Sequence, residues 1–204
     1  MPTSSASGTQ GYGDDAATLA ARYDSVAFAD VHRPVLHLIP ATTCSVLDIG
    51  AGSGRDAAAL AAMGHRVLAV EPTPPLRRLA RDAHRSPGIE WLDDSLPDLA
   101  VVRARCDTFD LILLSAVWMH LDASQRQAAM PGIATLLRPG GVVVISLRHG
   151  PLPPGRRMFD VTAEETIRLA EEVALRLLLR DHGPSVLPGK PDVCWTHLAF
   201  AAVP

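Results

Sequence analysis

The sequence predicts an α/β fold with a doubly wound, mostly parallel seven-stranded sheet that ends in an antiparallel hairpin. Short apolar runs alternate with helix-like segments from residue 45 onward, which is typical of βαβ units with right-handed crossovers. The last two apolar runs, "LRLLL" and "VCWTHLAF", have only a Gly/Pro-rich turn between them, so they can pair only as a hairpin. This ending differs from the sheet of two similar halves that binds dinucleotides.

The N-terminal region is expected to precede the sheet. Residues 1–13, "MPTSSASGTQGYG", are small, polar and glycine-rich, which predicts a disordered tail. Residues 14–43 are expected to be helical, because the apolar residues of "DDAATLAARYDSV" recur at helical spacing and Pro34 suits the first turn of a second short helix. Residues 14–204 are therefore expected to form a single domain.

The strands and helices of the sheet region are predicted from buried runs and from helix ends. Five apolar runs predict parallel strands: "VLDI", "HRVLAVE", "IEWL", "FDLILLSAV" and "VVVISL". Helices are expected over residues 55–63 and 74–85, and Gly64 is suited to end the first of them. Two further helices are expected to begin at capping boxes, in which Asp122 and Thr162 each precede a Gln or Glu by three residues.

The composition gives no indication of a nucleic-acid or membrane partner. The 204 residues include 19 Lys and Arg against 22 Asp and Glu, for a net charge of -3. The stretch from Leu111 to Met119 is shorter than the ~20 residues that span a bilayer, and no secretory signal is visible. Cys44, Cys106 and Cys194 lie far apart and without metal-ligand spacing, which predicts reduced thiols and no metal site. A cytoplasmic protein is expected, while its oligomeric state stays open.

A glycine-rich turn follows the first predicted strand. Glycines at a strand end allow a ligand to approach the backbone closely, and the N–H groups of the next helix can meet negative groups. Gly50, Gly52 and Gly54 form a GxGxG pattern, in which Arg55 occupies the third-glycine position of the dinucleotide fingerprint and no GK[ST] follows. Glu71 ends the second strand 21 residues after Gly50, where a carboxylate can accept hydrogen bonds from both hydroxyls of a ribose. Together these residues predict a nucleoside-type cofactor.

Four segments of the chain resemble the S-adenosylmethionine site of class I methyltransferases, which have a Rossmann-like fold. They are "VLDIGAGSGRDAAALAAMGHRVLAVEP", "WLDDSLPDL", "FDLILLSAVWMHL" and "LLRPGGVVVISL", within residues 45–147. The segment "LRHGPLPPGRRMF" is similar to a bacterial subgroup of small-molecule type. The resemblance implies S-adenosyl-L-methionine as cofactor, S-adenosyl-L-homocysteine as product and a small-molecule acceptor, with residues 14–43 as a lid.

The resemblance also implies where the cofactor contacts lie. Asp48 would orient the glycine loop and approach the methionine ammonium, and Glu71 would hold the ribose hydroxyls. Asp94 would accept a hydrogen bond from the adenine amino group, with Asp93 as its competitor for this role. The other implied contacts are Gly50, Ala51, Gly52, Pro72, Ser95, Leu96, Ser115 and Ala116.

Two further side chains each have two interpretations. Tyr23, from the N-terminal helices, either covers the cofactor or packs within its own helical segment. Arg55 either pairs with the cofactor carboxylate, which would be favourable in a closed site, or caps the glycine loop.

The chemistry that the resemblance implies depends mainly on positioning. The methyl group on a sulfonium is already a strong electrophile, and alignment with a nucleophile contributes about 7–11 kcal/mol of barrier reduction. A general base would add about 10²–10⁴-fold. His120 and His149 are the candidate bases, while the alternative role of His120 is to brace the turn before the next helix.

Candidate substrate contacts follow the fourth and fifth strands. Trp118 is a candidate for an apolar wall. Arg148 and Arg157, together with Arg156, are candidates for binding an acidic group, although each arginine alone can also be a solvated loop charge. This arginine cluster predicts an anionic small-molecule substrate.

Other functions stay open at this point. Methylation of RNA or of a protein is one alternative, although residues 115–118 read SAVW, which does not match the NPPY-type sequence of amino-directed base methyltransferases. An NAD-dependent oxidoreductase is disfavoured by Arg55 and by the terminal hairpin. A non-catalytic scaffold would be expected to have lost the loop glycines or Glu71, and both are present.

Overall fold

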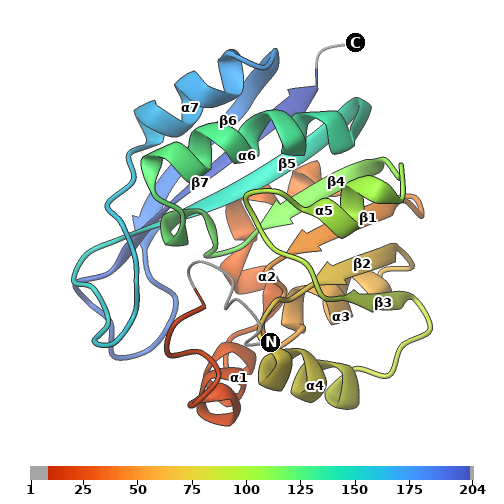
Figure 1. The fold of residues 1–204 in the computed structure, drawn as a ribbon. Coiled ribbons are helices and arrows are strands. Elements are labelled where there is room, and N and C mark those ends of the chain that lie inside the picture. Colours follow the sequence, from red (N-terminus) through yellow and green to blue (C-terminus); the bar gives the residue numbers. More distant parts are fainter. Residues whose placement is uncertain (1–8, 203–204) are drawn as a thin grey trace, which may run out of the picture.

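A seven-stranded sheet forms the centre of the fold in the order β3-β2-β1-β4-β5-β7-β6 (Figure 1). The structure, a computed structural model, describes residues 9–202. Strands β1 to β5 are parallel to one another, while β7 is antiparallel to both β5 and β6. The predicted parallel sheet with a C-terminal antiparallel hairpin is therefore confirmed. The strands are β1 (Ser45–Ile49), β2 (Arg66–Val70), β3 (Ile89–Leu92), β4 (Phe109–Leu114), β5 (Leu137–His149), β6 (Leu175–Pro184) and β7 (Cys194–Ala202).

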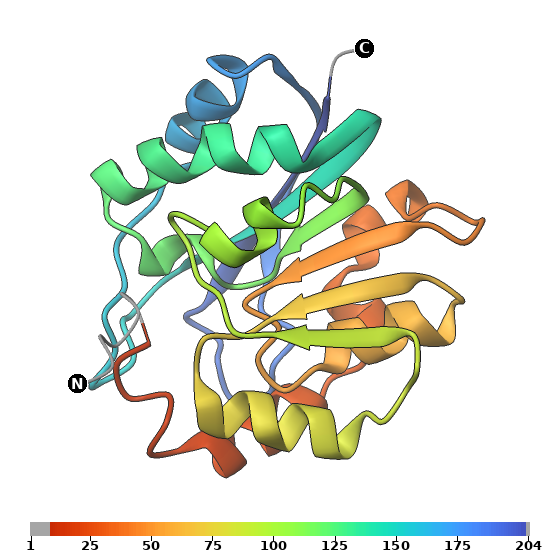
Figure 2. The same cartoon turned by 45° about the vertical axis from the view of Figure 1, so that its right-hand side comes forward.

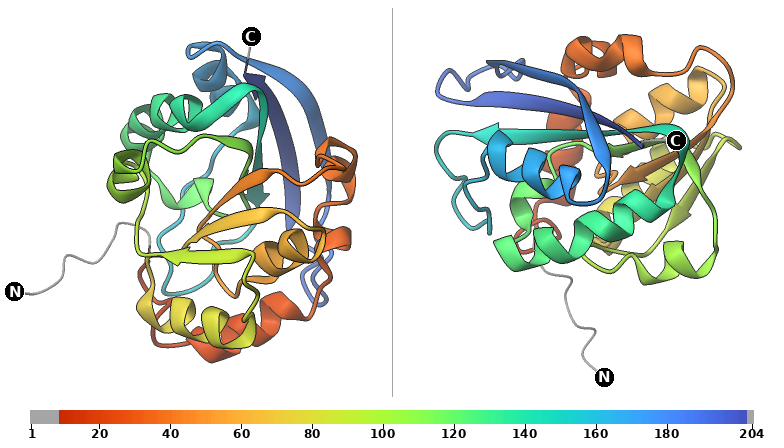
Figure 3. Two further views of the ribbon diagram at one scale, coloured as in Figure 1. Left: turned by 90° about the vertical axis from the view of Figure 1, so that its right-hand side faces the viewer. Right: turned by 90° about the horizontal axis from the view of Figure 1, so that it is seen from above.

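Helices cover both faces of this sheet (Figures 2 and 3). Helices α5, α6 and α7 share one apolar cluster with the sheet, while α2, the 3-10 helix η1 and α3 share a second cluster on the opposite face. Helix α1 packs on α4 near the β3 edge of the sheet (Figure 2). The helices are α1 (Ala16–Asp24), α2 (Phe28–Val31), η1 (Arg33–Leu38), α3 (Arg55–Ala62), α4 (Pro74–Ala83), α5 (Ala100–Ala104), η2 (Trp118–His120), α6 (Ala123–Leu136) and α7 (Ala163–Glu171).

The central strands are apolar on both faces because both faces are covered. In β1, Val46 belongs to one apolar cluster and Leu47 and Ile49 belong to the other, as expected for side chains that alternate along a strand. In β4, Leu113 and Leu114 divide in the same way. This burial fixes the register of β1 and β4, so that the carboxyl ends of both strands, where the site lies, are held in place.

Some boundaries differ from the sequence-based prediction. Strand β4 ends at Leu114 and not at Val117, because Ala116 takes a left-handed conformation with φ of 60°. Strand β5 begins before the RPGG turn, since Leu137 already pairs with Phe109 ahead of an irregularity in the register. The short helix α5 was not predicted.

The two predicted capping boxes have different outcomes. The carboxylate of Asp122 accepts a hydrogen bond from the Gln125 backbone N–H at 2.9 Å, and the Gln125 side chain accepts one from the Asp122 N–H at 3.0 Å, so this box is confirmed. Thr162 accepts from the Glu165 N–H at 3.1 Å, but the Glu165 carboxylate pairs with Arg126 at 2.8 Å. Only half of the second box is therefore formed.

The start of the described chain lies over the loop that follows β5. Residues 1–8 of the predicted tail lie outside the described residues. Residues 9–13 are described, and a Cβ added to Gly11 would lie 2.8 Å from the Gly155 carbonyl oxygen. The Tyr12 hydroxyl hydrogen-bonds to the ring of His120 at 2.9 Å. This segment thus contributes to the wall of the site.

The described residues contain neither a membrane-spanning helix nor a metal-binding cluster. Between residues 9 and 202, no helix combines the length and the apolar character needed to cross a bilayer. The same part of the chain has no group of three or more His, Cys, Asp or Glu side chains arranged to hold a metal ion.

Candidate cofactor and acceptor site

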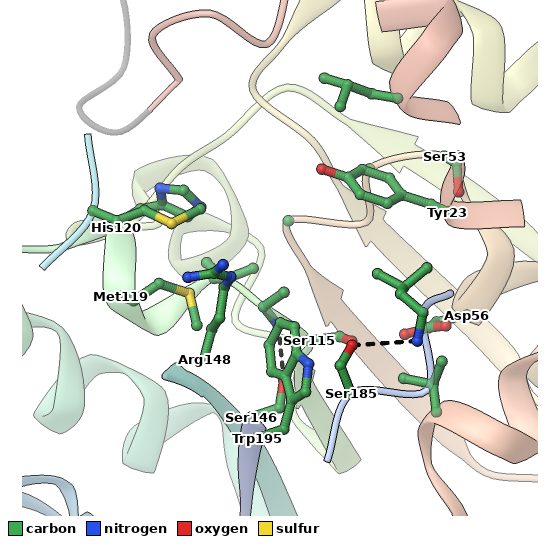
Figure 4. A pocket seen from close by; sticks show the side chains of 18 of the residues that line it. Tyr23, Ser53, Asp56, Ser115, Met119, His120, Ser146, Arg148, Ser185 and Trp195 are labelled. Carbon is green, nitrogen blue, oxygen red and sulfur yellow. Dashed lines mark hydrogen bonds between the residues drawn. The ribbon is translucent and has the colours of Figure 1, made fainter. Parts of the chain in front are cut away.

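A cavity of about 760 Å³ opens at the carboxyl ends of β1, β2, β4 and β5. This is the edge at which open α/β sheets bind ligands, beside the point where the strand order reverses between β1 and β4. The glycine loop, the N-terminal helices, the loop after β5 and the β6–β7 turn all contribute to its wall (Figure 4).

The glycine loop is shaped by backbone conformations that only glycine adopts without strain. Gly50 has φ of 72°, and a Cβ at this position would lie 2.5 Å from a methyl carbon of Val117. Gly54 has φ of 85°, and its Cβ would lie 2.7 Å from the Trp91 ring. The N–H groups of Gly50 and Ala51 both donate to the Val70 carbonyl, at 2.8 and 2.9 Å. The loop is therefore held against the end of β2, with its backbone bare toward the cavity.

Glu71 lies at the end of β2 and connects the loop to the next helix. Its carboxylate accepts hydrogen bonds from the Gly52 N–H at 2.9 Å and from the Thr73 N–H at 2.7 Å. Burial raises the pKa of the Glu71 carboxyl group, because the residue is only 5% exposed. A carboxylate has about four acceptor positions, so two remain for hydroxyl groups of a ligand.

Asp48 provides a second buried carboxylate at the end of β1. Burial, and then the neighbouring Asp56 charge, raise the pKa of Asp48 well above its ordinary value. Its Oδ2 atom has no hydrogen-bond partner among the described residues, although Asp48 lines the cavity. A buried acceptor left without a donor is costly, so this oxygen is suited to a cationic ligand group.

The loop is tied to the N-terminal helices by three polar contacts. Asp56 accepts from the His32 ring at 2.8 Å and from Arg55 at 2.7 Å. Burial raises the pKa of Asp56, but the His32 and Arg55 charges outweigh it and hold the pKa below its ordinary value. Arg55 also donates to the Tyr23 carbonyl at 3.2 Å, and Ser53 donates to the Asp24 carboxylate at 2.6 Å. Arg55 therefore caps the loop in this structure, while its side chain still lines the cavity.

The two acidic residues that follow β3, Asp93 and Asp94, lie in different surroundings. Asp94 lines the cavity, whereas Asp93 does not and pairs with Arg77 at 2.6 Å. The Asp94 carboxylate accepts from the N–H groups of Ser95, Val101 and Val102 at 2.8 to 2.9 Å, which anchors the start of α5. Pro72, Ser95 and Leu96, all predicted from the sequence, line the same part of the cavity.

The end of β4 contributes the opposite side of the cavity. Ser115 and Ala116, both predicted, line it, and the Ala116 N–H donates to the Ser146 hydroxyl at 2.8 Å. Tyr23 also lines the cavity, and its hydroxyl accepts a hydrogen bond from Arg156 at 3.3 Å. Figure 4 shows the Tyr23 ring directed into the cavity from α1.

His120 lies in this wall at the end of η2. Its Nδ1 atom lies 2.8 Å from the Arg157 carbonyl oxygen, which can only accept, so Nδ1 carries the proton. The Nε2 atom is then an acceptor, and the Tyr12 hydroxyl donates to it at 2.9 Å. Burial lowers the pKa of His120. A neutral imidazole whose Nε2 lone pair can accept a proton is the form that a general base requires.

Three predicted side chains do not line the cavity, because neighbouring residues point in different directions. Trp118 is fully buried in the core, while the next two residues of η2 face the cavity. His149 follows Arg148 along β5 and so points to the other face, where its ring contacts the Thr196 hydroxyl at 2.8 Å. Arg157 pairs with Asp122 at 3.1 Å. The expectation that these three side chains line the cavity is therefore wrong.

Other residues take their places. Arg148 lines the cavity as predicted, and Arg156 lines it in place of Arg157. Met119 takes the position in the wall that was expected of Trp118. Tyr12 and Trp195 were not predicted; no signal near Tyr12 in the sequence points to a contact 108 residues away. The hairpin was predicted, but not that its turn reaches the site.

Comparison with known proteins agrees with this geometry. A family model described as a methyltransferase domain matches residues 46–141. A cypemycin N-terminal methyltransferase of Streptomyces is 30% identical over 190 residues, which cover 85% of this chain and 73% of that protein. The chain belongs to the class I S-adenosylmethionine-dependent methyltransferases.

Other methyltransferases match in sequence or in fold. An uncharacterised methyltransferase of Alkaliphilus oremlandii is 31% identical over 100 residues, which are 49% of this chain. The match covers 44% of that relative, so this chain spans less than half of the relative's length. The crystal structure of a Burkholderia thailandensis 1,6-didemethyltoxoflavin-N1-methyltransferase, with its substrate and S-adenosylhomocysteine bound, has the same fold with a TM-score of 0.69. It is 21% identical, and the match covers 96% of this chain and 84% of that one.

The residues of this methyltransferase fit the cofactor of the family, S-adenosylmethionine. Glu71 has two acceptor positions left for the ribose hydroxyls, and the unpartnered Asp48 oxygen suits the methionine ammonium. The left-handed Gly50 and Gly52 leave two positions of the loop without side chains, where the methionine chain would lie against the backbone. The family therefore decides against the NAD-dependent alternative.

Proposed function

We propose that this protein transfers a methyl group from S-adenosylmethionine to a small-molecule acceptor by in-line displacement. The observation that supports the proposal is that one cavity contains both the Glu71 and Asp48 carboxylates and the His120 ring. Its volume of about 760 Å³ lies within the range of about 300–1,000 Å³ that is usual for small-molecule sites.

In this proposal one side of the cavity holds the cofactor. Glu71 binds the ribose hydroxyls, Asp48 binds the ammonium group, and the backbone of the glycine loop lies along the methionine chain. Pro72, Ser95 and Leu96 surround the adenine. The Asp94 carboxylate already accepts three backbone N–H groups, so its contact with the adenine amino group uses its remaining acceptor position.

The other side of the cavity positions the acceptor. When bound, the cofactor supplies a methyl group on a positively charged sulfur, which becomes a neutral thioether on transfer. The protein holds the acceptor atom in line with this methyl group and away from water, and such alignment is worth about 7–11 kcal/mol. The lid of residues 14–43 contributes Leu19 and Tyr23 to the walls that exclude water.

His120 is the general base of this proposal. Its Nε2 lone pair accepts the proton that an N–H or O–H acceptor loses, and the Arg157 carbonyl stabilises the imidazolium through Nδ1–H. The Tyr12 hydroxyl donates to this same lone pair, so the acceptor group takes the place of that hydroxyl.

A second candidate acceptor is the N-terminal amine of a peptide. It is favoured by one observation, that the relative named for methylating the N-terminus of cypemycin aligns over 85% of this chain. The exposed Leu152 and Val186 side chains at the cavity mouth would then contact the peptide.

Titration calorimetry with S-adenosylhomocysteine and with NAD tests the cofactor half of the proposal. We expect S-adenosylhomocysteine to bind and NAD not to bind, and the reverse result would refute the proposed cofactor. A methyl-transfer assay across carboxylate, phenol, amine and thiol metabolites, with a peptide amine as a separate arm, tests the acceptor half. Transfer to the peptide alone would replace the small-molecule proposal by the second candidate.

A further inference from the structure

Two arginine side chains of the cavity wall lack an acidic partner. Arg148 donates to the carbonyl oxygens of Gly150 and Pro151, at 3.3 and 2.7 Å. Arg156 donates to the Tyr23 hydroxyl at 3.3 Å. Among residues 9–202, no carboxylate lies within 4.0 Å of the guanidinium group of either one.

Two other arginines of the same cavity, Arg33 and Arg55, are neutralised. Arg33 pairs with Asp30 at 2.7 Å, and Arg55 pairs with Asp56 at 2.7 Å. Arg22 on α1 and Lys190 in the β6–β7 turn also line the cavity, and neither forms an ion pair among the described residues. They add to the uncompensated positive charge of Arg148 and Arg156.

Each of the two arginines lies near another group of the cavity wall. Burial lowers the pKa of Arg148, and the nearby charge of Arg22 lowers it further. The Arg156 guanidinium lies 4.2 Å from the centre of the Tyr12 ring, and Tyr12 in turn contacts His120. A group of cations beside a partly closed cavity is favourable only when an anion compensates it.

The acidic side chains of the cavity lie elsewhere. Asp48, Asp56 and Glu71 belong to the cofactor side, at the ends of β1 and β2. Asp181 and Asp192 are exposed on the β6–β7 side and form no ion pair with the described arginines. The charge in front of Arg148 and Arg156 is therefore left for a ligand.

The surface beside the arginines is apolar. Trp195 lies directly opposite Arg148 across the antiparallel β5–β7 pair, so both side chains are on the same face of the sheet. Met119 and Met158 also line the cavity. In Figure 4 the Arg148 side chain lies between Met119 and Trp195 and points toward the space in front of His120. This arrangement fits a flat apolar body with one charged end.

We propose that Arg148 and Arg156 form an anion subsite, and that the methyl acceptor is an apolar, aromatic acid bearing a carboxylate or a phosphate. The acid binds the two guanidinium groups, the ring lies against Trp195 and the methionines, and the nucleophilic N–H or O–H of the same molecule is presented to His120. This inference rests on the proposed function, because it names the class of acceptor for that same site.

The test measures binding and not only turnover. The protein is saturated with S-adenosylhomocysteine and titrated with benzoate, phenyl phosphate, benzamide and benzylamine, which share a ring and differ in charge. We expect at least one of the two acids to bind about tenfold or more tightly than the neutral amide and the cationic amine, since hydrogen bonds to a charged group are stronger than neutral ones.

Arginine variants locate the subsite. Arg148→Gln and Arg156→Gln are each expected to weaken acid binding by about tenfold or more, while Arg148→Lys, which keeps the charge and loses the two-pronged geometry, falls between. Arg103→Gln is the control, because Arg103 is exposed on α5 and does not line the cavity. Each variant is first titrated with S-adenosylhomocysteine to show that the cofactor side is intact.

The outcomes separate this inference from the proposed function. Failure of the wild-type protein to bind S-adenosylhomocysteine would overturn the proposed function and the inference with it. Normal binding of S-adenosylhomocysteine, combined with equal affinity for benzoate and benzamide, would overturn the anion subsite alone. The same holds if neither acid binds, or if Arg148→Gln and Arg156→Gln bind the acids as the control does. Preference for benzoate or for phenyl phosphate identifies the acidic group.

Discussion

Replacement of Glu71 by glutamine tests the cofactor side most directly. The carboxylate accepts one backbone N–H on each oxygen, from Gly52 at 2.9 Å and from Thr73 at 2.7 Å. A glutamine amide has only one acceptor oxygen, so the ribose loses at least one charged acceptor and a backbone N–H competes for the other. A hydrogen bond to a charged group is worth about 1.5–3 kcal/mol, so Glu71→Gln should weaken S-adenosylhomocysteine binding by about 10- to 150-fold.

Calorimetry measures this loss, and a thermal melt shows whether the fold survives. Removing one buried acceptor costs about 1–3 kcal/mol, but removing a buried charge offsets part of it, so we expect the melting temperature to fall by roughly 2–6 °C. Asp93→Asn is the matched control, since Asp93 follows the neighbouring strand and faces away from the cavity. Unchanged affinity of Glu71→Gln would show that the carboxylate does not bind the ribose.

Three further predictions follow from the same geometry. Burial lowers the pKa of His120, so the imidazole is neutral at pH 7 and the rate of methyl transfer should decline only below pH ~6.5. His120→Asn should remove this pH dependence and lower the rate by about 10²–10⁴-fold. Gly50→Ala should destabilise the fold by about 1–2 kcal/mol or more and abolish cofactor binding. Gly132→Ala, in open space on α6, should be neutral or stabilising by about 0.5–1 kcal/mol, and equal melting temperatures of the two variants would contradict this prediction. The pKa of Asp56 is depressed, so the ionised carboxylate stabilises the fold above the ordinary aspartate pKa of about 4, and this stabilisation is lost as the pH falls. Asp56→Ala should lower the free energy of unfolding in urea by about 3–5 kcal/mol at pH 7, and the stability of the variant should depend less on acid pH than that of the wild type.

Most of the fold could be predicted from local patterns. The strands around residue 48 and residue 112 are apolar on both faces, and a run of this kind leaves little choice but a covered parallel strand. Helix α5 was missed because it has only five residues and is anchored by the carboxylate of Asp94, which lies outside it. A short helix stabilised by a distant side chain leaves no periodic pattern in the sequence.

The cofactor side of the site could be predicted better than the acceptor side. Glu71 and Asp48 end adjacent parallel strands, so topology alone brings them together. The acceptor side is built from loops, where the direction of each side chain depends on turns that the sequence does not reveal. This is why Arg156 and Met119 line the cavity while their neighbours Arg157 and Trp118 do not.

The ties between the glycine loop and the N-terminal helices limit how far this protein can be shortened. A version that begins at β1 would keep every strand, yet the carboxylate of Asp56 would stay enclosed after losing His32, and Arg55 would lose the Tyr23 carbonyl. Such a truncated chain would be expected to fail in its methyl-donor loop before its sheet fails. The segment from α1 to η1 is in this sense part of the donor pocket and not an appendage to it.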